Sequence, residues 1–189
     1  MRISIFIDGN NLYRMSRDNL GWNIDLRKLI SYYNAKGTVV DAYYYAAIDP
    51  EKGKTSFHKL LPYFGFVLIS KPLKTFGSSP DSPKKGNLDI EIVLDIFNTI
   101  DNYDMAVLVS GDGDFLRPLE LLRARGKQFE ILSTRGVIAQ ELRDVAGMHY
   151  RDLVSMESIL KYSESSKVHL EEIVLSEKDM VPIEEEYPV

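Results

Sequence analysis

The sequence has no cysteine and only three histidines among its 189 residues. The lack of cysteine excludes disulfides, thiolate zinc sites and cysteine nucleophiles, and it suits a reducing compartment. The histidines, His58, His149 and His169, are scattered and show no metal-binding spacing. No stretch approaches the roughly 20 apolar residues of a membrane helix, and the short apolar run at the N-terminus meets Asp8 too early for a signal peptide. We therefore expect a cytoplasmic protein without membrane contact.

Common nucleotide-binding and hydrolase motifs are missing as well. There is no Walker phosphate loop, no GxGxxG after the first predicted strand and no serine in a nucleophile elbow. The composition, 44% hydrophobic and 27% charged, is that of an ordinary globular domain with a sizeable core. The chemistry must therefore rest on other side chains.

The net charge of −5 is unevenly distributed along the chain. From Glu164 onward, eight acidic residues stand against Lys167 and Lys178. The preceding residues, 1–163, hold 20 acidic and 21 basic side chains and carry a charge of about +1. A nearly neutral body with clustered acids is compatible with RNA processing, but it lacks the strongly basic surface of a pure RNA-binding protein. We expect residues 163–189 to form an acidic tail that is disordered or depends on a protein partner.

Apolar periodicity predicts alternating strands and helices over residues 1–162, which we assign to one domain. Strands are predicted over 2–8, 38–47, 66–70, 105–110 and 128–133. Helices are predicted over 10–19, 25–30, 52–63, 88–100, 115–125, 137–146 and 156–162. Proline, glycine and serine predict a long loop over 71–86. The alternation indicates a Rossmann-like, three-layer α/β fold, with a parallel sheet of about five strands and helices on both faces.

Three aspartates follow two of the predicted strands directly. Asp8 ends the first strand, and Asp112 and Asp114 come just after the fourth. In the usual doubly wound order these strands are neighbours, so their carboxyl ends flank the switch point where ligands bind in such sheets. Each aspartate alone is also explained as a turn residue or helix cap. Together they predict a site.

Asp89 is a fourth candidate for this site because of its position on a predicted helix. The polar residues of the helix at 88–100 form one stripe, interpreted as its solvated face, and Asp89 lies roughly 200° away from Glu91 by helix geometry. Asp89 should therefore point toward the core side, where a carboxylate must be paired, capped or bound to metal. The alternative is a first-turn carboxylate that answers the helix dipole. The stripe consists of Glu91, Asp95 and Asn98, and the core side of Ile92, Val93 and Ile96.

Four converging carboxylates repel one another unless a cation joins them. Oxygen-only ligands suit Mg²⁺ or Mn²⁺ better than zinc. Such an ion polarises a phosphoryl oxygen and lowers the pKa of a bound water, which are the two requirements of phosphodiester hydrolysis. Asp8, Asp89, Asp112 and Asp114 are therefore the candidate metal-binding and catalytic residues.

Three runs, in order, resemble the signatures of NYN domains. These are Phe6-Ile7-Asp8-Gly9-Asn10-Asn11, Lys85-Gly86-Asn87-Leu88-Asp89 and Ser110-Gly111-Asp112-Gly113-Asp114-Phe115. NYN domains are PIN-like ribonuclease domains, and this chain is similar to their LabA-like bacterial branch over about residues 1–150. The middle element usually reads Lys-Gly-Val-Asp in this branch. Here Asn87-Leu88 adds one residue between Gly86 and Asp89, which shifts Lys85 from the usual register.

The resemblance implies a PIN-like parallel sheet, an acidic pocket for Mg²⁺ or Mn²⁺, and RNA cleavage by the four aspartates. It also implies that Asn11 holds Asp8 or a phosphate in place and that Ser110 lies at the pocket floor. Lys84 and Lys85 are candidate substrate-binding residues beside Asp89, with an ordinary solvated loop as the alternative.

Three functions are open from the sequence. The first is a metal-dependent ribonuclease acting on single-stranded RNA. The second is a non-catalytic regulatory module that binds RNA, nucleotide or protein through the same pocket or the tail. The third, a small-molecule phosphatase, ranks last because Asp8-Gly9-Asn10 replaces the Asp-x-Asp signature of haloacid dehalogenases. A homodimer is compatible with all three.

The aromatic run Tyr43–Tyr45 alternates in a strand, which favours core packing over base stacking.

Overall fold

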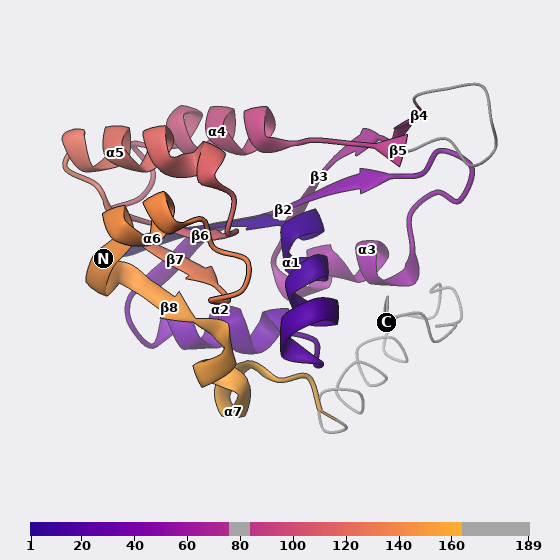
Figure 1. Cartoon of the computed structure of the whole chain (residues 1–189), viewed down its shortest axis with the longest axis horizontal. Helices are drawn as coiled ribbons and strands as arrows, with labels where there is room; N and C mark the ends of the chain where they lie inside the picture. Colours follow the sequence, from indigo (N-terminus) through magenta and orange to yellow (C-terminus); the bar gives the residue numbers. More distant parts are fainter. Residues whose placement is uncertain (76–83, 164–189) are drawn as a thin grey trace.

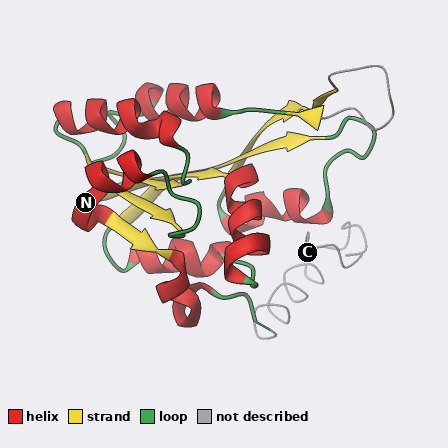
Figure 2. Cartoon of the chain, in the orientation of Figure 1, coloured by secondary structure: helices red, strands yellow, loops and turns green. Residues whose placement is uncertain are grey.

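The computed structural model describes residues 1–75 and 84–163 of the chain. Its main sheet has six parallel strands in the order β3-β2-β1-β6-β7-β8, with helices on both faces (Figures 1 and 2). These strands are β1 (Arg2–Asp8), β2 (Thr38–Ile48), β3 (Val67–Pro72), β6 (Met105–Val109), β7 (Gln128–Ser133) and β8 (Tyr150–Asp152). The α-helices are α1 (Gly9–Met15), α2 (Leu26–Asn34), α3 (Ser56–Leu60), α4 (Asp89–Asn98), α5 (Leu116–Ala124), α6 (Gln140–Ala146) and α7 (Glu157–Leu160). The predicted Rossmann-like fold class is confirmed.

Two apolar cores lie on opposite faces of the sheet because strand side chains alternate in direction. Ile3, Ile5 and Ile7 of β1 point into the core formed with α1, α2, α3 and α7. Phe6 points into the other core, formed with α4, α5 and α6. Figure 1 shows α4 and α5 along one side of the sheet and α2 and α3 along the opposite side.

Strand β1 lies at the centre of the sheet, between β2 and β6. Ile7 pairs with Tyr44 of β2 and with Val109 of β6, so β1 and β6 end close to one level, whereas β2 continues to Ile48. The chain goes from β1 to β2 on one side and reaches β6 on the other. This reversal creates the switch point at which the carboxyl ends of β1 and β6 meet.

Two expectations about strands need correction. The edge strand β8 was not predicted, because three half-buried residues, Tyr150–Asp152, carry too little alternation to be recognised. The expected loop at 71–86 contains regular structure. Strand β3 runs to Pro72, and β4 (Lys74–Thr75) pairs antiparallel with β5 (Lys84–Lys85). Backbone pairing holds β4 and β5 together and leaves no side-chain pattern in the sequence. The composition of this segment therefore predicted a loop.

Several helices are shorter than predicted because turns of other pitch complete them. The first ends at Met15 and continues as a π-helical turn over Ser16–Leu20, and 3-10 turns over Leu61–Phe64, Gly113–Phe115, Gly147–His149 and Leu153–Met156 flank α3, α5, α6 and α7. The predicted Asp25 cap of α2 is confirmed, since its side chain accepts a hydrogen bond from the Arg27 backbone.

The interpretation of the polar stripe of α4 as a solvated face is wrong for two of its three residues. Ile90 and Leu94 are the outward residues, 70% and 53% exposed. Glu91 instead forms an ion pair with Lys71 of β3. The Tyr45 hydroxyl of β2 donates a hydrogen bond to Asp95 Oδ2 over 2.9 Å, and the third residue, Asn98, is exposed as expected. Polar groups on the neighbouring strands therefore turned this acidic face inward.

The predicted acidic tail lies outside the described residues from 164 onward. Within the part of the chain that the structure describes, no helix is long and apolar enough to cross a membrane.

Candidate active site

Asp8 is held in a fixed position at the end of β1. It is the N-cap of α1, and its Oδ1 accepts a hydrogen bond from the Asn11 backbone N–H over 3.0 Å. Its Oδ2 accepts a second hydrogen bond from the Ser110 hydroxyl over 3.2 Å. The residue is 9% exposed. A carboxylate with both oxygens bound and so little exposure is well ordered before any ligand arrives.

The Asn11 side chain ties β1 to β6. Its Oδ1 accepts a hydrogen bond from the Gly111 backbone N–H over 3.1 Å, and Asn11 is almost fully buried. The resemblance implied that Asn11 holds Asp8 or a phosphate. The structure shows that its backbone holds Asp8, whereas its side chain holds the loop after β6. Ser110 is completely buried, and its hydroxyl oxygen also accepts a hydrogen bond from the Asp112 N–H.

Asp112 and Asp114 begin the turn that leads into α5. Asp112 caps this turn, and its Oδ1 accepts a hydrogen bond from the Asp114 N–H over 3.1 Å. Asp112 is half-buried and Asp114 is exposed. The capping role proposed from the sequence is therefore real for Asp112, but it leaves its second carboxylate oxygen and the whole Asp114 carboxylate available to a ligand.

Asp89 belongs to α4, which covers the face of the sheet opposite to α1. It is the first residue of α4, half-buried, and its N–H donates to Asn87 Oδ1 over 2.8 Å. The segment before it is anchored to α1, because Asn10 Nδ2 donates to the Gly86 carbonyl over 2.9 Å. The carboxylate of Asp89 is close enough to Asp8 and Asp112 for the charges to influence one another.

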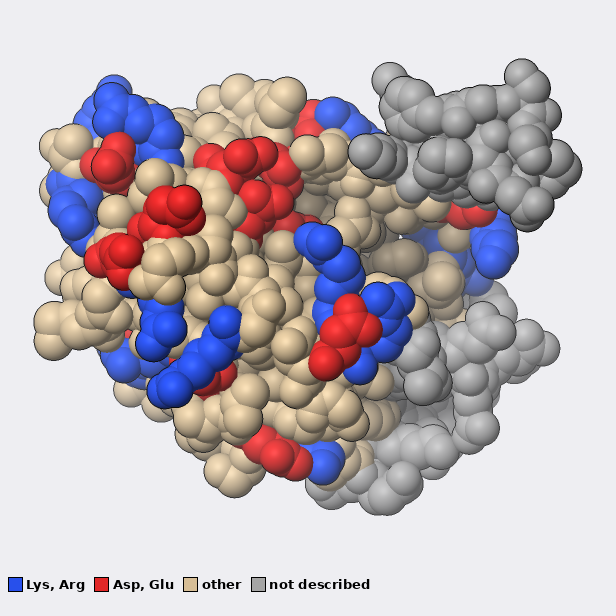
Figure 3. Space-filling view, viewed as in Figure 1, with Lys and Arg blue, Asp and Glu red and all other residues tan. Residues whose placement is uncertain are grey.

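Asn10 was missed by sequence reasoning. It belongs to the same run as Asp8 and Asn11, but its partner lies 76 residues away, so no local pattern indicates the contact. Figure 3 shows acidic side chains gathered where α4 and α5 begin, with basic side chains over α1.

Three glycines allow the strand ends and loops of the site to approach closely. A Cβ on Gly9 would lie 2.5 Å from the Tyr45 carbonyl oxygen, and one on Gly86 would lie 2.3 Å from the Ala47 Cβ. A Cβ on Gly111 would lie 2.6 Å from the Ser133 hydroxyl. Each of the three matched motifs thus contributes one glycine that a larger residue cannot replace without displacing its neighbours.

Asp8, Asp89, Asp112 and Asp114, here called the acid cluster, influence one another electrostatically. Burial raises the pKa of Asp8, hydrogen bonds from Asn11 and Ser110 oppose this, and the charges of Asp89 and Asp112 raise it further. Burial also raises the pKa of Asp89, as do the charges of Asp112 and Asp114, while the hydrogen bond with Asn87 lowers it. None of the four forms an ion pair with another described side chain. Among the side chains that the structure describes, none offsets the negative charge of the cluster by an ion pair.

The acid cluster fits a hard divalent cation in charge and in donor chemistry, since all its donors are carboxylate oxygens. Across residues 1–75 and 84–163, no three histidine, aspartate or glutamate side chains lie close enough to hold one ion together. Rotation of side chains is therefore needed before three carboxylates coordinate one ion.

The predicted site residues separate into two groups. The structure brings together the acid cluster, Asn11 and Ser110 at the switch point. Lys84 and Lys85 lie in β5, where the structure describes their backbone but not their side chains. Their predicted role in substrate binding stays a prediction.

Comparison with known proteins bears on this geometry. The model of the NYN domain family matches residues 2–155, which include every residue of the acid cluster. The chain belongs to the NYN domain family. Its sheet is accordingly the PIN-like, nuclease-type sheet of that family, and NYN domains are generally ribonuclease-like.

Two similar proteins extend this assignment. The NYN chain is 39% identical over 168 residues to the low amplitude and bright protein LabA of Synechococcus elongatus, covering 86% of this chain and 89% of LabA. A crystal structure of a protein of unknown function from Vibrio parahaemolyticus superposes with a TM-score of 0.69 at 28% identity. That match covers 84% of this NYN chain and 95% of the Vibrio protein. The resemblance to the LabA-like branch is thereby confirmed.

Proposed function

We propose that this NYN protein is a metal-dependent ribonuclease that hydrolyses phosphodiester bonds of single-stranded RNA at the acid cluster. One observation supports this most strongly. Carboxylates from the ends of β1 and β6 and from the start of α4 converge on the switch point, where burial and the charges of the neighbouring acids raise the pKa of Asp8 and of Asp89. Buried like charges are costly to a fold, so their convergence needs a positively charged ligand to offset it.

The residues have distinct roles in this proposal. Asp8 is the fixed carboxylate, because two hydrogen bonds leave it no freedom to turn. Asp89 and Asp112 would complete the Mg²⁺ or Mn²⁺ site. Asp114, the most exposed of the four, would orient the attacking water and accept its proton. A divalent cation bound there supplies positive charge beside the phosphate and makes water more acidic.

A second function, a non-catalytic module, is favoured by one observation. The described carboxylates do not form a group of three at coordinating distance. A protein that uses the same pocket to bind RNA or a nucleotide without cleaving it needs no such group.

Cleavage of end-labelled single-stranded RNA distinguishes the two functions. Wild type should cut with Mn²⁺ or Mg²⁺ and not with EDTA, and Asp112→Asn should lower the rate by about 100-fold or more. Asp101→Asn makes the same chemical change at an exposed position outside the cluster and should leave the rate unchanged. Metal-dependent binding without any cutting by folded wild type would instead support the non-catalytic module.

A further inference from the structure

The exposed side of α1 leads directly away from the acid cluster. Asp8 caps this helix, and Leu12 and Met15 belong to its buried side. Asn10 and Arg14, four residues apart, lie together on the exposed side. A helix rises about 1.5 Å per residue, so Arg14 lies roughly 9 Å beyond Asp8 along the axis. The exposed side of α1 therefore begins at the acid cluster and carries a positive charge a short distance from it.

Arg14 is an exposed cation that the protein leaves available. Across residues 1–75 and 84–163, no carboxylate forms an ion pair with its guanidinium. Arg135, which follows β7 at the same end of the sheet, is by contrast bound to Asp152, with 3.1 Å between Nε and Oδ2. A guanidinium stays charged at every physiological pH and can bind a phosphate through two parallel hydrogen bonds. Arg14 is therefore suited to bind a phosphate.

Arg17 extends the positive charge by one helical turn, where Asp18 partly offsets it. Its Nε donates to Asp18 Oδ1 over 2.6 Å and its Nη2 to Oδ2 over 2.8 Å. These hydrogen bonds lower the pKa of Asp18 and the charge of Arg14 lowers it further, so both arginines lie within electrostatic reach of one carboxylate. Figure 3 shows basic side chains gathered over α1. Both partners of the ion pair are half exposed, and such pairs are weak enough for a phosphate to displace the carboxylate.

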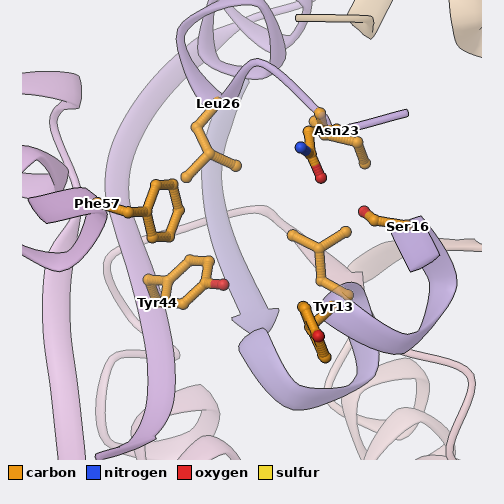
Figure 4. Close-up of a pocket in the computed structure, with 8 residues that line it drawn as sticks. Tyr13, Ser16, Asn23, Leu26, Tyr44 and Phe57 are labelled. Carbon is orange, nitrogen blue, oxygen red and sulfur yellow. The ribbon is translucent and has the colours of Figure 1, made fainter. Parts of the chain in front are cut away.

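The inner side of α1 has no room for a substrate. A hollow between α1, β2 and α3 has a cavity volume of about 40 Å³, far below the roughly 300–1,000 Å³ of small-molecule sites. Figure 4 shows the Tyr44 and Phe57 rings on one wall of this hollow and Ser16 on the other. A polymer that reaches the acid cluster along α1 must therefore lie on the exposed side of the helix.

RNA that approaches the acid cluster needs positive charge beside it. The four carboxylates repel phosphates, and a metal ion bound among them offsets this charge only at the cleavage site. The neighbouring phosphates need cations of their own, because neutralisation of phosphates supplies most of the sequence-independent affinity for nucleic acid. Proteins that bind single strands supply such cations along a positively charged path that follows the backbone.

We propose that single-stranded RNA runs from the acid cluster along the exposed side of α1, with Arg14 bound to the phosphate next to the cleavage site and Arg17 bound to one further along. Asp18 opposes this binding, because it competes with the RNA for Arg17. The inference rests on the proposed function for its choice of RNA. Arg14 and Arg17 bind through charge, so their contribution is independent of base sequence.

Binding of RNA in EDTA tests this path without metal-dependent cleavage. Fluorescence anisotropy of a labelled oligouridine, titrated with the full chain at a series of KCl concentrations, gives the affinity and its salt dependence. Arg14→Ala should weaken binding about two- to fivefold at low salt and reduce the slope of log K against log [KCl] by about 0.7, the loss of one phosphate contact on a single strand. Arg14→Lys keeps the charge and should retain the slope. Arg125→Ala, at an exposed position at the C-terminal end of α5, is the matched control and should bind like wild type.

Asp18→Asn should have the opposite effect. The substitution releases Arg17 and should tighten binding about two- to fivefold at low salt, which a variant that merely disturbs the fold cannot do. Arg17→Ala added to Asp18→Asn should remove the gain. Equal binding by Arg14→Ala and Arg125→Ala, no gain from Asp18→Asn, or no binding by folded wild type would each overturn the proposal.

The RNA path and the nuclease can fail separately. Wild type that binds oligouridine, with the expected changes in the variants, but never cuts it would reject the nuclease and keep the path. Wild type that cuts RNA with Mn²⁺ while Arg14→Ala leaves both the salt slope and KM unchanged would reject the path and keep the nuclease.

Discussion

The Asn11 side chain accepts a hydrogen bond from the backbone N–H of Gly111, with 3.1 Å between Oδ1 and N. This contact joins the residues that follow β1 and β6, two strands separated by about 100 positions in the chain. It thereby fixes the distance between Asp8, the last residue of β1, and Asp112, which follows Gly111. A buried amide thus sets the width of the acidic site.

Asn11→Ala should destabilise the fold and loosen the site together. The substitution leaves a buried N–H without an acceptor, which costs about 1–3 kcal/mol. Urea unfolding measures this loss, and calorimetry with Mn²⁺ should show weaker binding. Asn98→Ala, on the exposed side of α4, is the control and should change the free energy of unfolding by less than about 0.5 kcal/mol. Equal effects of the two substitutions would remove the structural role of Asn11.

Gly111→Ala should be poorly tolerated, whereas Gly113→Ala should be mild. The new Cβ at Gly111 would meet the backbone of Ile138 at 2.9 Å as well as the Ser133 hydroxyl, and backbone atoms cannot move aside easily. Overpacking of this kind costs about 1–3 kcal/mol. At Gly113 the nearest atom is the Ala139 Cβ at 3.2 Å. Thermal unfolding of both variants tests the difference, and similar midpoints would contradict the close packing around Gly111.

Glu130 of β7 should make stability depend on pH. Burial alone raises the pKa of Glu130, but hydrogen bonds from Arg151 and Tyr33 and the charge of Lys36 outweigh it, so the folded-state pKa is lowered. The stabilisation by ionised Glu130 is therefore complete above the unfolded pKa, near 4.5, and is lost as the pH falls through the lowered value.

Glu130→Gln should accordingly cost about 2 kcal/mol at neutral pH, because Gln cannot replace charge-assisted hydrogen bonds. The difference from wild type should shrink when urea unfolding is repeated below about pH 4. Glu120→Gln, which removes an exposed ion pair with Arg117, should have little effect at either pH. A difference that stays constant with pH would show that Glu130 does not titrate as inferred.

Asp89→Asn should stabilise the protein in EDTA and abolish its stabilisation by Mn²⁺. Burial raises the pKa of Asp89 and the charges of Asp112 and Asp114 raise it further, so removing the charge relieves both the cost of burial and the repulsion. A cation that binds only the folded state adds about 2.7 kcal/mol at 100 times its dissociation constant. Calorimetric scans with EDTA and with Mn²⁺ measure both effects. If Mn²⁺ raises the midpoints of wild type and variant equally, Asp89 is not a ligand.

Local chemistry in the sequence determined much of this protein. The alternation of Ile3, Ile5 and Ile7 around Phe6 requires a strand buried on both faces, and the position of Asp8 and Asp112 after such strands predicts their convergence. Those statements depend on neighbouring residues and on the general rules of parallel sheets. They therefore needed no knowledge of distant contacts.

Only the tertiary structure decided which polar residues meet. Glu91 and Asp95 have the spacing of a solvated stripe, yet Lys71 and Tyr45 turn them inward, while Ile90 and Leu94 are left exposed. The bond from Asn10 to Gly86 and the hollow around Tyr44 likewise join segments that lie far apart in the chain. Periodicity records the average hydrophobicity of a helix or strand face, but hydrogen bonds and ion pairs depend on individual partners that only folding brings within reach.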